Sequence, residues 1–181
     1  MSVCRFEEAL SAAQVGSSLE RCWEQRPFFN TGVLSAAVPV EFAHDRILAA
    51  ITETEALLSR TEVISEGRRM SWQNISGQDI ATREGIETAF KKGLTILVRR
   101  FDLEHQGTAS LARAFSKRLR CHVFATLFLS NHLGPAFPAH YDSANVIAVQ
   151  LHGSKRWNLF SQVNPLPQSD EDVKPIENDP S

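Results

Sequence analysis

Phe137-Pro138-Ala139-His140-Tyr141-Asp142 is the most specific stretch of the sequence, and it continues as Val146-Ile147-Ala148-Val149-Gln150-Leu151-His152-Gly153-Ser154-Lys155-Arg156-Trp157. In a strand, side chains two positions apart lie on one face, so His140 and Asp142 are expected to point at a common ion. An imidazole nitrogen and a carboxylate oxygen supply two corners of the facial triad that binds non-haem Fe(II), and a second histidine supplies the third. The stretch therefore predicts half of a metal site.

The residues that follow predict a pair of strands. Residues 146–151 are rich in β-branched side chains, and Gly153 behind them can adopt a positive φ. The pattern predicts a strand, a tight turn and a returning strand that carries Lys155, Trp157 and Leu159 on one face. If that face lines a barrel, Lys155 is a buried cation that needs an anion, and a metal-bound keto acid offers a distal carboxylate.

The complete string resembles a known family. His140-Tyr141-Asp142 followed by Gln150, Gly153, Lys155 and Trp157 is similar to the JmjC and cupin-like 2-oxoglutarate oxygenases, especially the branch that hydroxylates ribosomal proteins. The segments Trp23-Glu24-Gln25-Arg26-Pro27-Phe28-Phe29 and Gly93-Leu94-Thr95 extend the resemblance toward the N-terminus. The resemblance implies that His140 and Asp142 hold Fe(II) and that Lys155 binds the 5-carboxylate of the cosubstrate 2-oxoglutarate. An isolated His-x-Asp pair is a weak motif, whereas the whole string is specific.

One expected strand, residues 122–130, departs from the family pattern. In similar proteins this strand commonly carries an Asn two residues before a Tyr, both near the cosubstrate, and the matching positions here are Thr126 and Phe128. A threonine hydroxyl can donate a hydrogen bond to a carboxylate, but a phenylalanine ring cannot. Thr126 is therefore a candidate cosubstrate-binding residue beside Lys155. No residue beyond the two metal ligands is expected to be catalytic.

The third iron ligand that the resemblance implies is missing. The family takes it from a histidine on a later strand, and none of the histidines here follows Lys155. His152 is a substitute ligand only if the turn at Gly153 brings it beside His140. Two explanations compete: a piece of a longer oxygenase, which we favour, or a natural short protein that has lost catalysis. An incomplete sheet has unpaired edges, which predicts aggregation or pairing with another chain as a homo-oligomer.

Length and composition indicate an ordinary globular protein. The chain has 181 residues, of which 43% are hydrophobic and 22% charged, enough for one domain. A net charge of −2 gives no electrostatic reason to expect direct nucleic-acid binding. The three scattered cysteines lack metal-ligand spacing and indicate reduced thiols in a cytoplasmic protein. Charged residues near the N-terminus and the lack of an apolar run of about 20 residues predict neither a signal peptide nor a membrane span.

Local patterns predict an α+β chain. Helices are expected at residues 6–23, 45–59, 80–92 and 108–119, strands at 94–98 and 122–130, and a polar loop at 60–74. Asp45, Asp79 and Thr108 are the expected N-caps of three of these helices. Residues 1–120 would form a helical and mixed region that includes the first sheet strand, residues 121–162 the first part of the β-helix, and residues 163–181 a loop or disordered tail. The expected fold is a double-stranded β-helix, the cupin and JmjC jelly roll, incomplete in this chain and preceded by an N-terminal helical region.

The resemblance implies an Fe(II)- and 2-oxoglutarate-dependent oxygenase. Its expected partner is a protein or peptide substrate, such as a ribosomal protein, or an amino acid whose side chain is hydroxylated. The alternative is a catalytically inactive JmjC or cupin-like scaffold that acts as a protein-binding module. A metal-binding cupin with another activity, such as an isomerase, is disfavoured because it has no keto-acid carboxylate for Lys155 to bind.

Overall fold

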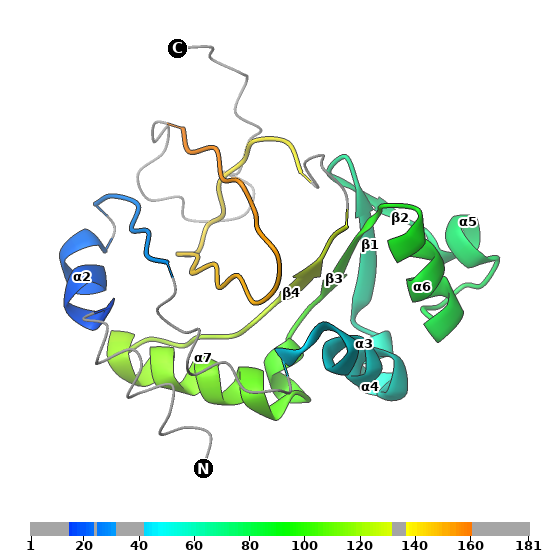
Figure 1. Ribbon diagram of the computed structural model, residues 1–181, viewed down its shortest axis with the longest axis horizontal. Helices are drawn as coiled ribbons and strands as arrows, with labels where there is room; N and C mark the ends of the chain where they lie inside the picture. Colours follow the sequence, from blue (N-terminus) through cyan, green and yellow to red (C-terminus); the bar gives the residue numbers. More distant parts are fainter. Residues whose placement is uncertain (1–14, 24, 32–41, 132–136, 161–181) are drawn as a thin grey trace.

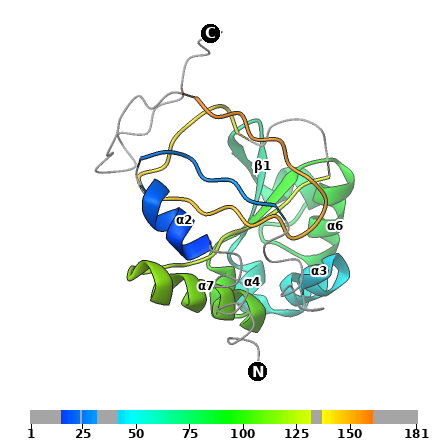
Figure 2. The ribbon, with the colours of Figure 1, turned by 60° about the vertical axis from the view of Figure 1, so that its left-hand side comes forward.

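The computed structural model describes residues 15–23, 25–31, 42–131 and 137–160 of the chain. Its elements are α2 (Val15–Cys22), α3 (His44–Glu53), α4 (Glu55–Leu58), β1 (Thr61–Ser65), β2 (Arg68–Met70), α5 (Trp72–Ser76), α6 (Arg83–Lys91), β3 (Thr95–Val98), the 3-10 helix η2 (Phe101–Leu103), α7 (Gln106–Leu119) and β4 (Leu127–Leu129). Figure 1 shows helices α3 to α6 packed beside the sheet and residues 137–160, drawn in yellow to orange, next to β4. The turned view in Figure 2 agrees with this arrangement.

The four strands form one antiparallel sheet in the order β2-β1-β3-β4. Val63 pairs with Ile96, and Ile96 pairs with Leu129. Paired residues of antiparallel strands lie on the same face of a sheet, and neighbours along a strand lie on opposite faces. The register therefore assigns each strand residue to one of two faces.

One face of the sheet builds the hydrophobic core. Val63, Ile96 and Val98 are fully buried on it, and Leu127 and Leu129 pack against the same core. The helices contribute the opposing apolar side chains, which are Ile47, Ile51, Leu57, Ile75, Ile86, Ala89, Leu111, Ala114 and Phe115. Burial of these side chains holds α3, α5, α6 and α7 to the sheet.

The opposite face, here called the site face, is formed by Glu62, Ile64, Thr95, Leu97 and Phe128. Glu62, Leu97 and Phe128 form a row across β1, β3 and β4 because each pairs with the next. Phe137 and Lys155 contact Phe128 on this face, whereas Ile147, Val149 and Leu151 pack against the core. The site face thus meets the stretch that carries the predicted metal ligands.

The expected helices form, with different ends. The helix expected over residues 45–59 is two helices, α3 and α4, separated at Thr54, whose φ of −114° and ψ of 110° are extended. Thr82 caps α6 by accepting a hydrogen bond from the Gly85 amide, so the expected cap at Asp79 was wrong. His105 Nδ1 caps α7 in the same way at 3.2 Å from the Thr108 amide, and Thr108 is already inside the helix. Residues 1–14 and 161–181, where part of the first helix and the tail were expected, lie outside the described residues.

The loop expected over residues 60–74 was wrong, because it contains a β-hairpin and α5. Ser65 pairs with Arg68, so Glu66 and Gly67 form a two-residue turn. Both have positive φ, 50° and 76°, as the common tight hairpin turns require. Strand β3, in contrast, lies where the apolar run predicted it, and all four of its residues are buried.

The strands expected at 146–151 and 155–159 do not form in the structure. Within the described residues these segments have no strand partner, and the strand expected over 122–130 is reduced to Leu127–Leu129. The predicted alternation is nevertheless present, because Ile147, Val149 and Leu151 pack against the core while the residues between them are exposed. Gly153 has the expected positive φ of 65°. An extended segment needs a hydrogen-bonded neighbour to become a strand.

The architecture is α+β, and its antiparallel sheet is compatible with part of the expected jelly roll. The described thiols Cys22 and Cys121 are free. Among the described helices, none combines the length and the apolar character that crossing a bilayer requires.

Candidate functional site

His140 and Asp142 lie side by side on the extended segment that crosses the site face. The Nε2 atom of His140 is 3.8 Å from Oδ1 of Asp142, and both side chains are partly exposed. Two ligands that bind one ion at right angles, each at about 2.1 Å, are about 3 Å apart. A small rotation of either side chain closes this difference, so the pair fits a shared metal ion as two of its ligands.

The imidazole of His140 is held in the tautomer that a metal ligand needs. Its Nδ1 lies 2.8 Å from the carbonyl oxygen of Pro138. A carbonyl oxygen can only accept a hydrogen bond, so Nδ1 carries the proton and Nε2 presents a lone pair on the side of Asp142. A backbone carbonyl bound to the second ring nitrogen is the usual way in which proteins orient a metal-binding histidine.

Lys155 lies on the same side of the sheet and contacts two aromatic rings. Its Nζ is 5.6 Å from the centroid of Phe128 and 5.7 Å from that of Trp157. Phe128 in turn contacts Phe137 edge-on at 6.3 Å, and Phe137 lies 5.5 Å from the His140 ring. Lys155 and His140 are therefore connected through Phe128 and Phe137. Lys155 itself is exposed.

Thr126 immediately precedes β4 and is half-buried. The alternation along β4 puts residue 126 on the side of Phe128, the site face. The hydrogen bond from its hydroxyl to a carboxylate of the cosubstrate stays a prediction. Phe128 and Phe137 were missed as parts of the site, since Phe128 stood out in the sequence only as a departure from the family pattern.

The β1–β2 hairpin supports the ligand segment at Pro138. A Cβ atom added at Gly67 would lie 2.6 Å from Cδ of Pro138, far inside van der Waals contact. The turn thus touches the residue whose carbonyl orients His140.

Gly67→Ala is expected to destabilise the protein and to weaken metal binding. The substitution combines a positive φ of 76° with a clash against Pro138. The backbone strain alone costs roughly 1–2 kcal/mol. Gly77→Ala is the matched control, because Gly77 has a φ of 72° and nothing within 4 Å of an added Cβ. Urea unfolding should show a larger loss of stability in Gly67→Ala than in Gly77→Ala, and Mn²⁺ titration should show weaker metal binding only in Gly67→Ala. Equal metal affinities would contradict the contact.

A charged cluster occupies the other end of the site face. Glu62 forms ion pairs with Arg99, at 2.9 Å, and with Arg69. Burial raises the pKa of the Glu62 carboxyl, but the hydrogen bonds and charges of Arg99 and Arg69 outweigh it, so that the pKa is lowered overall. Glu62 therefore stays ionised at neutral pH and bridges β1, β2 and the end of β3.

A third metal ligand does not lie beside His140 and Asp142 in the part of the chain that the structure describes. No group of three His, Cys, Asp or Glu side chains suited to a metal ion occurs among these residues. His152 lies near α3 instead, with its ring 6.2 Å from that of His44. The carbonyl oxygen of His152 accepts a 2.7 Å hydrogen bond from Gln150. The structure thus brings two of the predicted ligands together and gives no support to His152 as a substitute.

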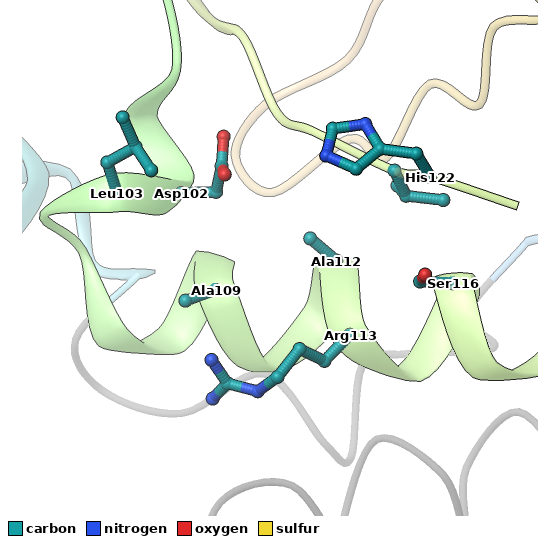
Figure 3. Close-up of a pocket in the computed structure, with 8 residues that line it drawn as sticks. Asp102, Leu103, Ala109, Ala112, Arg113, Ser116 and His122 are labelled. Atoms are coloured by element: carbon teal, nitrogen blue, oxygen red, sulfur yellow. The ribbon is translucent and has the colours of Figure 1, made fainter.

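A separate cleft of about 310 Å³ lies between η2, α7 and residues 122–123. Figure 3 shows Asp102, Ala112, Arg113 and His122 around it. Its polar groups already have partners: Asp102 accepts hydrogen bonds from Arg100 and from the Ala125 amide, and Arg113 donates to Ser110. Burial raises the pKa of Asp102, but these hydrogen bonds and the charge of Arg100 lower it overall. The cleft contains none of the predicted site residues, and its side chains serve to join η2, α7 and the β4 segment.

Comparison with known proteins agrees with the sequence motif. The JmjC domain family model matches residues 97–180. The chain is 26% identical over 176 residues to ribosomal oxygenase 2 of Rattus norvegicus and over 175 residues to that of Mus musculus, matches that cover 89% of this chain and 35% of each relative. The chain thus spans about a third of the length of these curated relatives. No solved structure matches it.

The matched region begins in β3 and includes β4, Lys155, His140 and Asp142. The similarity to ribosomal oxygenase 2 extends over most of the described sheet and helices. Residues 97–180 therefore match the JmjC domain, and the chain is similar to ribosomal oxygenase 2 over about a third of that protein's length.

Proposed function

We propose that this chain forms the Fe(II)- and 2-oxoglutarate-binding half of an oxygenase that hydroxylates a protein side chain. The match of residues 97–180 to the JmjC domain points to a 2-oxoglutarate-dependent oxygenase at the level of the family. The observation that carries the proposal is the series of contacts along the site face from Lys155 through Phe128 and Phe137 to His140, with Asp142 beside it. A ribosomal protein is the proposed substrate class, and an amino acid is the second.

In this proposal His140 and Asp142 hold the metal through Nε2 and a carboxylate oxygen. Bound Fe(II) supplies the oxidising chemistry with O₂ and 2-oxoglutarate. The Pro138 carbonyl keeps His140 Nδ1 protonated, so that Nε2 stays available to the metal. Lys155 binds the far carboxylate of 2-oxoglutarate by a charge-assisted hydrogen bond. Phe128 and Phe137 lie between Lys155 and His140.

Lys155→Met is expected to weaken 2-oxoglutarate binding about 10-fold to 100-fold, because hydrogen bonds to charged groups contribute roughly 1.5–3 kcal/mol. Methionine keeps an unbranched apolar stem and removes the charged ammonium group with its hydrogen-bond donors. Arg156→Met is the matched control, since Arg156 is an exposed cation next in the chain. The measurement is anaerobic calorimetric titration of the Mn²⁺-loaded chain with 2-oxoglutarate. An equal loss in both variants would show that general charge, not Lys155, attracts the ligand.

A protein-binding scaffold without catalysis is the second candidate. It is favoured by one observation, namely that only two candidate metal ligands meet within the described residues. The two functions differ in a turnover assay: the oxygenase releases succinate from 2-oxoglutarate in the presence of Fe(II) and O₂, and the scaffold does not. Self-association, proposed from the exposed strand edge, would be measured by sedimentation in the same preparation.

A further inference from the structure

The ammonium group of Lys155 lies over two aromatic rings. Its Nζ is 5.6 Å from the Phe128 centroid and 5.7 Å from the Trp157 centroid, both within the range of about 6 Å over which a cation is attracted to a ring face. Phe128 is 43% exposed and Trp157 is 56% exposed, so neither ring is enclosed in the core. Two large aromatic side chains are thus directed at one cation on the surface of the site face.

The two rings are positioned by different parts of the fold. Phe128 is the middle residue of β4, paired with Leu97, and its ring is contacted by Phe137 at 6.3 Å and an angle of 79°. Trp157 stands two residues after Lys155, so in an extended chain both side chains point to the same side. The Phe128 ring is therefore positioned by the sheet, and the Trp157 ring belongs to the segment that carries Lys155.

The donors of Lys155 remain available to an external anion. Among the described residues, no carboxylate lies within ion-pair distance of its Nζ. A free lysine side chain samples many rotamers. Binding an anion restricts the side chain to a few of them, and this loss of conformational entropy weakens binding. Rings that hold the ammonium in place before the anion arrives reduce this loss.

We propose that Phe128 and Trp157 are positioning residues that hold the Lys155 ammonium where the far carboxylate of 2-oxoglutarate binds. This inference rests on the proposed function, because it takes 2-oxoglutarate as the anion. It also gives a role to Phe128, which cannot donate a hydrogen bond to the cosubstrate itself. The site then recognises the far carboxylate of a dicarboxylate through the pre-oriented Lys155 ammonium. The tyrosine hydroxyl that similar proteins commonly carry at the position of Phe128 is not needed.

Two measurements test this role. In NMR spectra of the metal-free chain, the ε-methylene protons of Lys155 should be shifted upfield by the ring currents, and less so in Phe128→Leu and Trp157→Leu. In calorimetric titrations of the Mn²⁺-loaded chain, each leucine variant should bind 2-oxoglutarate about threefold to tenfold more weakly. Binding of 2-oxobutyrate, which has no far carboxylate, should not change.

Two further variants serve as controls. Phe128→Tyr keeps the ring and should retain both the upfield shift and the affinity, which separates ring chemistry from loss of folding. Leu159→Ala changes an apolar side chain that is 66% exposed on the same segment and should leave both measurements unchanged.

The outcomes distinguish the positioning role from the proposed function. An unshifted Lys155 signal, or an equal loss of affinity for both keto acids, overturns the positioning role. Tight 2-oxoglutarate binding that neither leucine variant weakens overturns it while the proposed function stands. A wild-type chain that binds neither keto acid overturns both.

Discussion

Replacing His140 by Ala is expected to lower the Mn²⁺ affinity of the chain by at least about 100-fold. Disturbing only the residues that orient a metal ligand typically costs 10-fold to 100-fold, so removing the ligand costs more. His140 is well placed to be that ligand, because Nε2 lies 3.8 Å from Asp142 and Nδ1 is held by the Pro138 carbonyl. Calorimetric titration with Mn²⁺ under anaerobic conditions measures the change.

His152→Ala is the matched control for this substitution. His152 belongs to the same segment and is exposed, but its ring lies beside His44 and not beside His140. Its replacement should leave the Mn²⁺ affinity unchanged. If His152→Ala loses as much affinity as His140→Ala, the ion is held elsewhere, and the assignment of His140 and Asp142 as a ligand pair is wrong.

Phe101→Ala is expected to destabilise the protein by about 3–5 kcal/mol, the usual cost of removing a large aromatic side chain from a packed core. Phe101 is 1% exposed and stacks on His105 with ring centroids 4.8 Å apart. Its amide also donates a 2.9 Å hydrogen bond to the Ala125 carbonyl, next to the segment that leads into β4. The cavity left by the ring would loosen η2, the start of α7 and the approach to β4.

Leu103→Ala in the same 3-10 helix is the control for Phe101→Ala. Leu103 is 56% exposed, so its replacement should cost no more than about 0.5 kcal/mol. Urea unfolding followed by circular dichroism gives the unfolding free energies of both variants. The comparison holds if the unfolding free energy depends on urea concentration with the same slope as in wild type. A loss below about 1 kcal/mol for Phe101→Ala would mean that η2 is not packed as described.

Sequence patterns predicted the parts of the fold whose signals are local. The short apolar run at residues 94–98 produced β3, which is buried on both faces, and regular apolar spacing produced α6 and α7. The hairpin at 61–70 was missed because its site-face positions include Glu62 and Arg69, whose charges resemble those of a loop. Its turn uses Glu66 at positive φ, whereas Asn or Asp is the usual signal.

The sequence predicted which residues make up the candidate site but not their surroundings, and the roles of these residues in binding a metal and a cosubstrate stay predictions. The spacing of His140 and Asp142 was sufficient to expect a ligand pair, since two residues apart on an extended chain share a side. The contacts of Lys155 with Phe128 and of Pro138 with Gly67 join residues distant in sequence, so only the packed structure reveals them. The strands expected on either side of Gly153 depend on a hydrogen-bonding partner, which local sequence cannot supply.

We propose that His140, Asp142 and Lys155 together bind a metal ion and 2-oxoglutarate. The most direct test is an anaerobic titration of the folded wild-type chain with Fe(II) and 2-oxoglutarate, followed by visible absorption. We expect a weak metal-to-ligand charge-transfer band that requires both components and is lost in His140→Ala. Soluble, folded protein that gives no band at saturating concentrations of both would contradict the claim and favour the protein-binding scaffold.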